Sequence, residues 1–223
     1  MSNGEGDSVD LGTLAVSPVG SLEETGDLFL PYRLVGADGA TIAPASAYFA
    51  ELAACGRPAT TQRSYAMDLL RWFRFLGALG VAWDEATRSE ARDFCRWLVL
   101  APKPARAHWR RPDSDPPPAR RNPTPPNALT AKRAPGPTYA PATVAHAESV
   151  LRAFYDFHLE AGTGPMVNPF PLARGARSGR VDAHHNPLDP FTTTRRGRYR
   201  PKLVRRAPRA IPDAVFDQLF ARS

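Results

Sequence analysis

Proline is spread unevenly along this chain, and its distribution limits where regular structure can form. Of the 24 prolines among the 223 residues, 12 fall between residues 101 and 141. Proline lacks a backbone N–H and fixes φ, so this density blocks both helices and sheet ladders. We therefore expect residues 101–140 to form an extended insert without regular structure, which interrupts the packed part of the chain.

Helical patterns of apolar residues occupy the chain on both sides of this insert. Thr87 and Glu90 match a capping box at one helix start, and Gly80 follows another helix at its end. Ser46 is the expected N-cap of the first helix, and Pro141 suits the first turn of the last one. Four apolar stripes can together bury a bundle core. The expected helices span 46–55, 60–79, 87–100 and 141–162.

The N-terminal region contains a strong turn signal. Asp38 and Gly39 lie between two short apolar segments, which is typical of a tight hairpin. We expect a small β-hairpin over residues 27–44, leading into the helices. Residues 1–26 are rich in glycine, serine and acidic residues, and we expect a disordered tail there.

The second expected helix has two distinct faces. Its large apolar side chains cluster within roughly 100° of arc, and its three arginines fall within roughly 80° on the opposite side. One face should therefore pack, while the other is cationic. The apolar set is Tyr65, Leu69, Trp72, Phe73 and Leu76, and the cationic set is Arg63, Arg71 and Arg74.

The positive charge of the chain lies mainly in its connecting segments. The net charge is +7, but residues 101–141 carry +6 and residues 174–209 carry +9, which leaves −8 for the rest. Basic segments of this kind are commonly solvated linkers. They also suit a polyanionic partner, because neutralising phosphates releases condensed counterions.

The composition argues against several other classes of protein. Cys55 and Cys95 are too few for a disulfide scaffold or a cysteine-rich zinc site, and Cys95 lies between apolar neighbours, as a core residue would. The His184–His185 pair lacks the further ligands that zinc requires. No apolar run is long enough to span a membrane. We expect a soluble cytoplasmic protein with no metal, cofactor, membrane partner or small-molecule substrate.

Three segments carry a resemblance to a known family: 61–69 (TQRSYAMDL), 150–157 (VLRAFYDF) and 209–212 (RAIP). Together with the helix order, they resemble the N-terminal core-binding domain of tyrosine recombinases, the phage-integrase family. The resemblance implies a mainly α fold, a four-helix SAM-like bundle with a short N-terminal β-hairpin, a Pro-rich insert and a basic C-terminal linker.

The resemblance also implies a division of the chain. Residues 45–172 would form the core-binding domain, 173–209 the basic interdomain linker, and 210–223 the first helix of a catalytic domain that the chain truncates. In this family the catalytic Arg, Lys, His-x-x-Arg and Tyr nucleophile belong to that second domain, where strand exchange passes through a DNA–tyrosine phosphate. We assign no catalytic residue here, Tyr199 included, and expect the chain to bind duplex DNA without cleaving it.

The expected DNA contacts combine the cationic helix face with the fourth helix and the linker. The family often carries basic residues at the start of the fourth helix, whereas this chain offers only Thr143 and His146 there. A DNA-binding regulator that does not cut DNA and a helical protein-interaction module are the alternatives, and self-association on DNA is left open. The expected contacts are Thr61, Gln62, Arg63, Arg71, Arg74, Thr143, His146, Arg198, Arg200, Lys202, Arg205 and Arg206.

Overall fold

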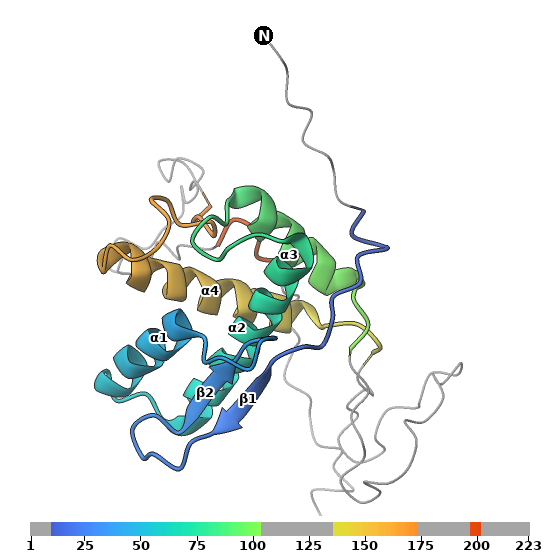
Figure 1. The fold of residues 1–223 in the computed structure, drawn as a ribbon. Helices are drawn as coiled ribbons and strands as arrows, with labels where there is room; N and C mark the ends of the chain where they lie inside the picture. The colour runs from blue at the N-terminus through green and yellow to red at the C-terminus, as the bar shows by residue number, and fades with distance from the viewer. Residues whose placement is uncertain (1–9, 104–135, 174–196, 202–223) are drawn as a thin grey trace, which may run out of the picture.

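Helices dominate the part of the chain that the structure describes. The computed structural model describes residues 10–103, 136–173 and 197–201. Most of the expected linker, the expected helix at 210–223, and Lys202, Arg205 and Arg206 lie outside these residues. The described fold confirms a mainly α bundle with a small N-terminal sheet (Figure 1). Its elements are β1 (Ser21–Glu24), β2 (Tyr32–Val35), α1 (Ala43–Ala54), α2 (Ala59–Leu79), α3 (Arg88–Leu100) and α4 (Pro141–Glu160).

Local capping signals fix the ends of α2 and α3. Thr87 is the N-cap of α3, where its Oγ1 accepts from the Ser89 N–H at 3.2 Å. Glu90 reaches back, and its Oε2 accepts from the Thr87 N–H at 2.7 Å. Gly80 ends α2 with a φ of 67°, in the left-handed region that glycine adopts without strain. The expected capping box and stop signal are both confirmed.

The first helix begins earlier than the sequence suggested. α1 starts at Ala43, with Ile42 as an N-cap that makes no side-chain bond, so Ser46 is not the cap. Pro44 lies in the first turn, where its missing N–H costs nothing. The Ser46 N–H donates to the Ile42 carbonyl at 3.1 Å, which places Ser46 inside the helix.

The N-terminal sheet differs from the expected hairpin. The turn at Asp38–Gly39 forms, because the Gly36 N–H donates to the Ala40 carbonyl at 2.8 Å. Beyond it, however, Val35 makes only an isolated bridge, and the main partner of β2 is β1. β1 lies in the segment expected to be a disordered tail. β1 is held by antiparallel pairing with β2, and β2 in turn buries Leu34 against the helices. Local composition shows neither of these contacts.

The core is built around Trp72 of α2, which is fully buried. The rings of Phe75, Phe94, Tyr155 and Phe170 lie with centroids 5.1–6.2 Å from its own. Its indole Nε1 donates to the Tyr155 hydroxyl at 2.9 Å, which donates in turn to the Trp83 carbonyl at 2.8 Å. The hydrogen bonds therefore tie α2 to α4 and to the loop before α3.

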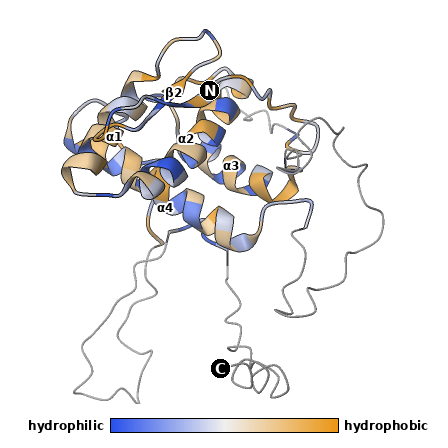
Figure 2. Cartoon of the chain, turned by 90° about the horizontal axis from the view of Figure 1, so that it is seen from below, coloured by the Kyte–Doolittle hydropathy of each residue, from blue (hydrophilic) through white to orange (hydrophobic). Residues whose placement is uncertain are grey.

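Hydrophobic and hydrophilic residues alternate along α2 and α4 (Figure 2), as expected of helices that bury one face.

Cys95 on α3 is 5% exposed, and burial raises the pKa of its thiol to about 12. This confirms that Cys95 is a core residue. None of the described helices is long and apolar enough to cross a membrane.

The two ends of the expected insert are paired with each other. Pro102 and Thr138 form an antiparallel bridge, and the Lys103 N–H donates to the Pro137 carbonyl at 2.8 Å. The expectation that residues 101–140 lack all regular pairing is therefore wrong at these margins. The pairing brings the end of α3 close to the start of α4, across residues 104–135, which lie outside the description.

Candidate nucleic-acid interface

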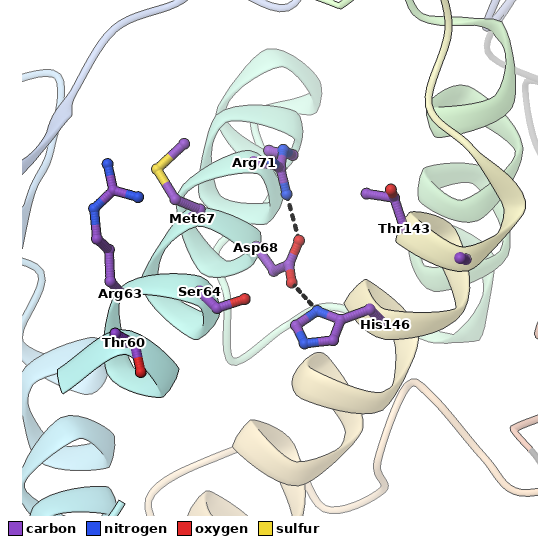
Figure 3. A pocket seen from close by; sticks show the side chains of 9 residues that line it. Thr60, Arg63, Ser64, Met67, Asp68, Arg71, Thr143 and His146 are labelled. Carbon is purple, nitrogen blue, oxygen red and sulfur yellow. Dashed lines mark hydrogen bonds and ion pairs between the residues drawn. The ribbon is translucent and has the colours of Figure 1, made fainter. Parts of the chain in front are cut away.

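The first turns of α2 and α4 meet at a surface pocket of about 450 Å³ (Figure 3). Most of the side chains around it are polar or charged, and the hydroxyls and cations come from both helices. The pocket is lined by Thr60, Arg63, Ser64, Met67, Asp68, Arg71, Ala142, Thr143 and His146.

Neither helix start at this pocket is capped by a side chain. Pro58 is the N-cap of α2 and Ala140 the N-cap of α4, and neither makes a side-chain cap bond. The first N–H groups of a helix have no partner within the helix, and its dipole places partial positive charge there. Two such ends at one pocket favour an anion such as a phosphate.

Asp68 is the acidic residue beneath this pocket, and its side chain is only 3% exposed. One carboxylate oxygen pairs with Arg71 Nη1, and the other lies 2.6 Å from His146 Nδ1. The Arg71 guanidinium also lies over the Tyr139 ring, 5.1 Å from its centroid. A single buried carboxylate therefore orients two cationic groups from different helices at the rim of the pocket (Figure 3).

The same carboxylate changes the charge of His146. The hydrogen bond with Asp68 raises the pKa of the imidazole, partial burial and the Arg71 charge oppose this, and the Asp68 charge reinforces it. The net direction is upward. Close to neutral pH, His146 therefore carries more positive charge than an isolated histidine would.

Arg63 is an exposed cation of the pocket. Its side chain is exposed and, within the described ranges, makes no ion pair or hydrogen bond with the rest of the protein. It lies one turn from the start of α2, and its side chain extends alongside Met67 (Figure 3). Its guanidinium is thus available to an external ligand.

Two other expected contacts on α2 lie away from the pocket. Gln62 is 3% exposed, and its Nε2 donates to the Arg57 carbonyl at 3.2 Å. Thr61 is half-buried, and its N–H donates to the Pro58 carbonyl at 2.9 Å. Both residues belong to the packing of the α2 start against the loop that precedes it.

Arg74 is held by the N-terminal segment of the chain. Its guanidinium donates to the carbonyls of Val19 at 2.7 Å, and of Pro18 and Gly20 at 2.8 Å each. Partial burial lowers the pKa of Arg74, but the guanidinium still stays protonated at neutral pH. The expected cationic face therefore divides, because Arg63 and Arg71 line the pocket whereas Arg74 fastens the segment before β1.

The linker arginines within the described residues lie on a short segment against the bundle. Arg198 and Arg200 are exposed and flank Tyr199, which packs on the core. Neither arginine lines the pocket between α2 and α4. The structure thus separates them from Arg63, Arg71, Thr143 and His146, which it brings together.

Three polar residues of this pocket were not among the expected contacts: Thr60, Ser64 and Asp68. Asp68 had a usable signal, because an acidic residue next to the apolar pair Leu69–Leu70 on a helix is costly to bury without a cationic partner.

Within the described ranges, no group of three or more His, Cys, Asp or Glu side chains is placed to hold a metal ion.

Comparison with known proteins identifies one region of the chain. Residues 45–111 match the family model described as the phage integrase N-terminal SAM-like domain. The match covers α2 and α3 and most of α1, including the α2 side of the pocket. No curated protein and no solved structure matches the chain. The match supports the resemblance that the sequence segments indicated.

Proposed function

We propose that this chain, which carries the phage-integrase N-terminal SAM-like domain, binds duplex DNA as the DNA-binding portion of a tyrosine recombinase. The pocket between α2 and α4 is the centre of the proposed interface. One observation carries the proposal: two helix N-termini without side-chain caps and the cations Arg63, Arg71 and His146 converge on the same pocket.

The geometry suits a phosphate group better than a neutral ligand. The starts of α2 and α4 both line the pocket, where the partial positive charge of a helix N-terminus favours an anion, and the hydroxyls of Thr60 and Thr143 add neutral donors. Arg71 and His146 are already oriented by Asp68, so little side-chain entropy is lost when they bind. These groups would position the duplex without reading its sequence.

Arg63 has the reach to do more than neutralise a phosphate. An exposed arginine near a helix N-terminus can enter the major groove and donate both of its outer N–H groups to the O6 and N7 atoms of guanine. In the proposed complex Arg63 therefore adds sequence preference at a specific site, whereas on mixed-sequence duplex it neutralises a phosphate, as the other cations of the pocket do.

In the proposal, this domain binds DNA and the strand-exchange chemistry of the family belongs to residues of another domain. Tyr199 fits this division, because its hydroxyl donates to the Arg88 carbonyl at 3.3 Å and its ring packs on the core. It has a structural position, not that of an exposed nucleophile.

A protein-interaction module is the second candidate. The observation in its favour is a pair of exposed apolar side chains at the end of α3, Val99 at 53% and Leu100 at 57%. Such a module predicts no salt-dependent affinity for duplex DNA, which separates the two functions in one assay.

A titration of labelled mixed-sequence duplex DNA at several salt concentrations tests the proposal. Arg63→Ala should reduce the magnitude of the slope of log K against log salt by about 0.9, the contribution of one phosphate contact. Arg96→Ala is the matched control, because this α3 arginine is 67% exposed and does not line the pocket. It should leave the slope nearly unchanged. Equal effects of the two variants, or salt-independent binding by the unmodified chain, would contradict the proposed interface.

A further inference from the structure

A short segment from the C-terminal part of the chain is attached to the bundle through a buried carboxylate. Glu148 of α4 is 0% exposed, and its Oε1 accepts from the Tyr199 N–H at 2.9 Å. Its Oε2 has no hydrogen-bond partner among the described residues. Burial raises the pKa of Glu148, against the opposing effects of the Tyr199 bond and of the Arg152 and Arg200 charges. Burying a carboxylate costs free energy unless its hydrogen bonds and nearby charges compensate for the lost hydration.

The segment fits this carboxylate closely. A Cβ added at Gly197 would lie 2.2 Å from each of the two Glu148 oxygens, so no larger residue can occupy the position without displacement. Gly197 also bridges Leu172, and the Arg198 N–H donates to the Pro171 carbonyl at 2.9 Å. Backbone contacts therefore hold the segment at Gly197, Arg198 and Tyr199.

A third contact extends to the start of α3. The Tyr199 hydroxyl donates to the Arg88 carbonyl at 3.3 Å, and the Tyr199 ring packs against the core. The segment thus contacts α4, the loop after it and the first residue of α3. Its two arginines, Arg198 and Arg200, stay exposed on either side of the anchored tyrosine.

We propose that Glu148 is a positioning residue that anchors residues 197–200 to the bundle and so fixes where Arg198 and Arg200 stand when the chain binds DNA. Holding both arginines in place before binding removes part of the ordering cost that a free basic tail would carry. The role in DNA binding rests on the proposed function, whereas the anchoring itself does not.

Hydrogen exchange of the whole chain in the absence of DNA tests the anchor. The Tyr199 and Arg198 amides should be protected, and Gly197→Ala should accelerate their exchange by about tenfold or more, because its Cβ displaces the segment from Glu148. Gly136→Ala is the matched control, since a Cβ there meets nothing within 4 Å. Gly197 lies outside the helices, so exchange in α2 and α4 should stay unchanged.

Removing the acceptor gives an independent check from the other side of the contact. Glu148→Ala should release the same two amides, and exchange in the helices reports whether the bundle stays folded. The anchor is contradicted if the Tyr199 amide is unprotected in the unmodified chain, or if Gly197→Ala and Gly136→Ala exchange alike.

DNA titrations then separate the anchor from its role in binding. Gly197→Ala should weaken duplex binding and reduce the magnitude of the salt slope, by up to about 1.8 if both phosphate contacts are lost. Unchanged DNA binding by a variant whose segment is released would overturn the positioning role. If the unmodified chain itself binds no DNA, the proposed function fails and the exchange results still decide the anchor.

Discussion

The central position of Trp72 predicts a large and specific loss of stability when the ring is removed. Trp72→Ala deletes a fully buried indole that packs against four aromatic rings: Phe75 on its own helix, Phe94 on α3, Tyr155 on α4 and Phe170 after α4. The surrounding elements converge on this ring from different directions, so they cannot all collapse into the cavity.

The size of the effect follows from this packing. Truncation of a buried aromatic ring to alanine costs about 3–5 kcal/mol in free energy of unfolding. The Tyr155 hydroxyl loses a donor, but it still donates to the Trp83 carbonyl at 2.8 Å, so no buried group is left without a partner. No further penalty is therefore added. Against a typical stability of about 5–15 kcal/mol, the loss is a large fraction of the total.

Urea denaturation and thermal unfolding followed by circular dichroism measure the change. We expect the free energy of unfolding to fall by about 3–5 kcal/mol and the melting temperature by roughly 10–20 °C. Phe29→Ala is the matched control, because that ring is 76% exposed and should cost little. A loss below about 1 kcal/mol for Trp72→Ala would show that this ring is not central to the core.

Three further predictions concern the cationic residues and the insert. Arg74→Ala should lower the melting temperature and speed amide exchange in β1 while leaving the DNA salt slope unchanged, because its guanidinium already binds the carbonyls of residues 18–20. The pKa of His146 in the folded chain is raised above its ordinary value of 6.5. The imidazole should therefore be charged and contribute fully to DNA binding below pH 6.5, and this contribution should decline as pH rises through the raised pKa. At constant ionic strength His146→Gln should flatten this dependence, and an equally steep profile in the variant would exclude His146 as its source. Deletion of residues 104–135 with a short glycine bridge should leave cooperative thermal unfolding intact, since Lys103 and Pro137 are hydrogen-bonded; loss of the transition would place the insert in the core.

Local signals in the sequence predicted the presence of all four helices, although Ser46 misplaced the start of α1. Thr87 and Glu90 fix a helix start through hydrogen bonds within three residues, and Gly80 fixes a helix end through its own φ. Trp72 was recognised as a core residue because helical periodicity places it on an apolar face. Each of these depends on neighbours in sequence alone.

The features that escaped prediction depend on distant partners. β1 forms because it pairs with β2, and a glycine- and serine-rich segment does not reveal that pairing. Arg74 resembles Arg63 on a helical wheel, but only the folded chain brings the carbonyls of residues 18–20 to it. Asp68 likewise acquires its role from His146, which lies 78 residues further along the chain.

Hydrogen exchange with and without duplex DNA tests the central claim most directly, because it locates the interface. We predict that DNA slows exchange at the first turns of α2 and α4, around residues 60–64 and 142–146, with much smaller changes on the exposed face of α3. We also predict that added salt reverses this protection. Protection confined to the end of α3 near Val99 and Leu100, or no change anywhere at saturating DNA, would contradict the proposed interface.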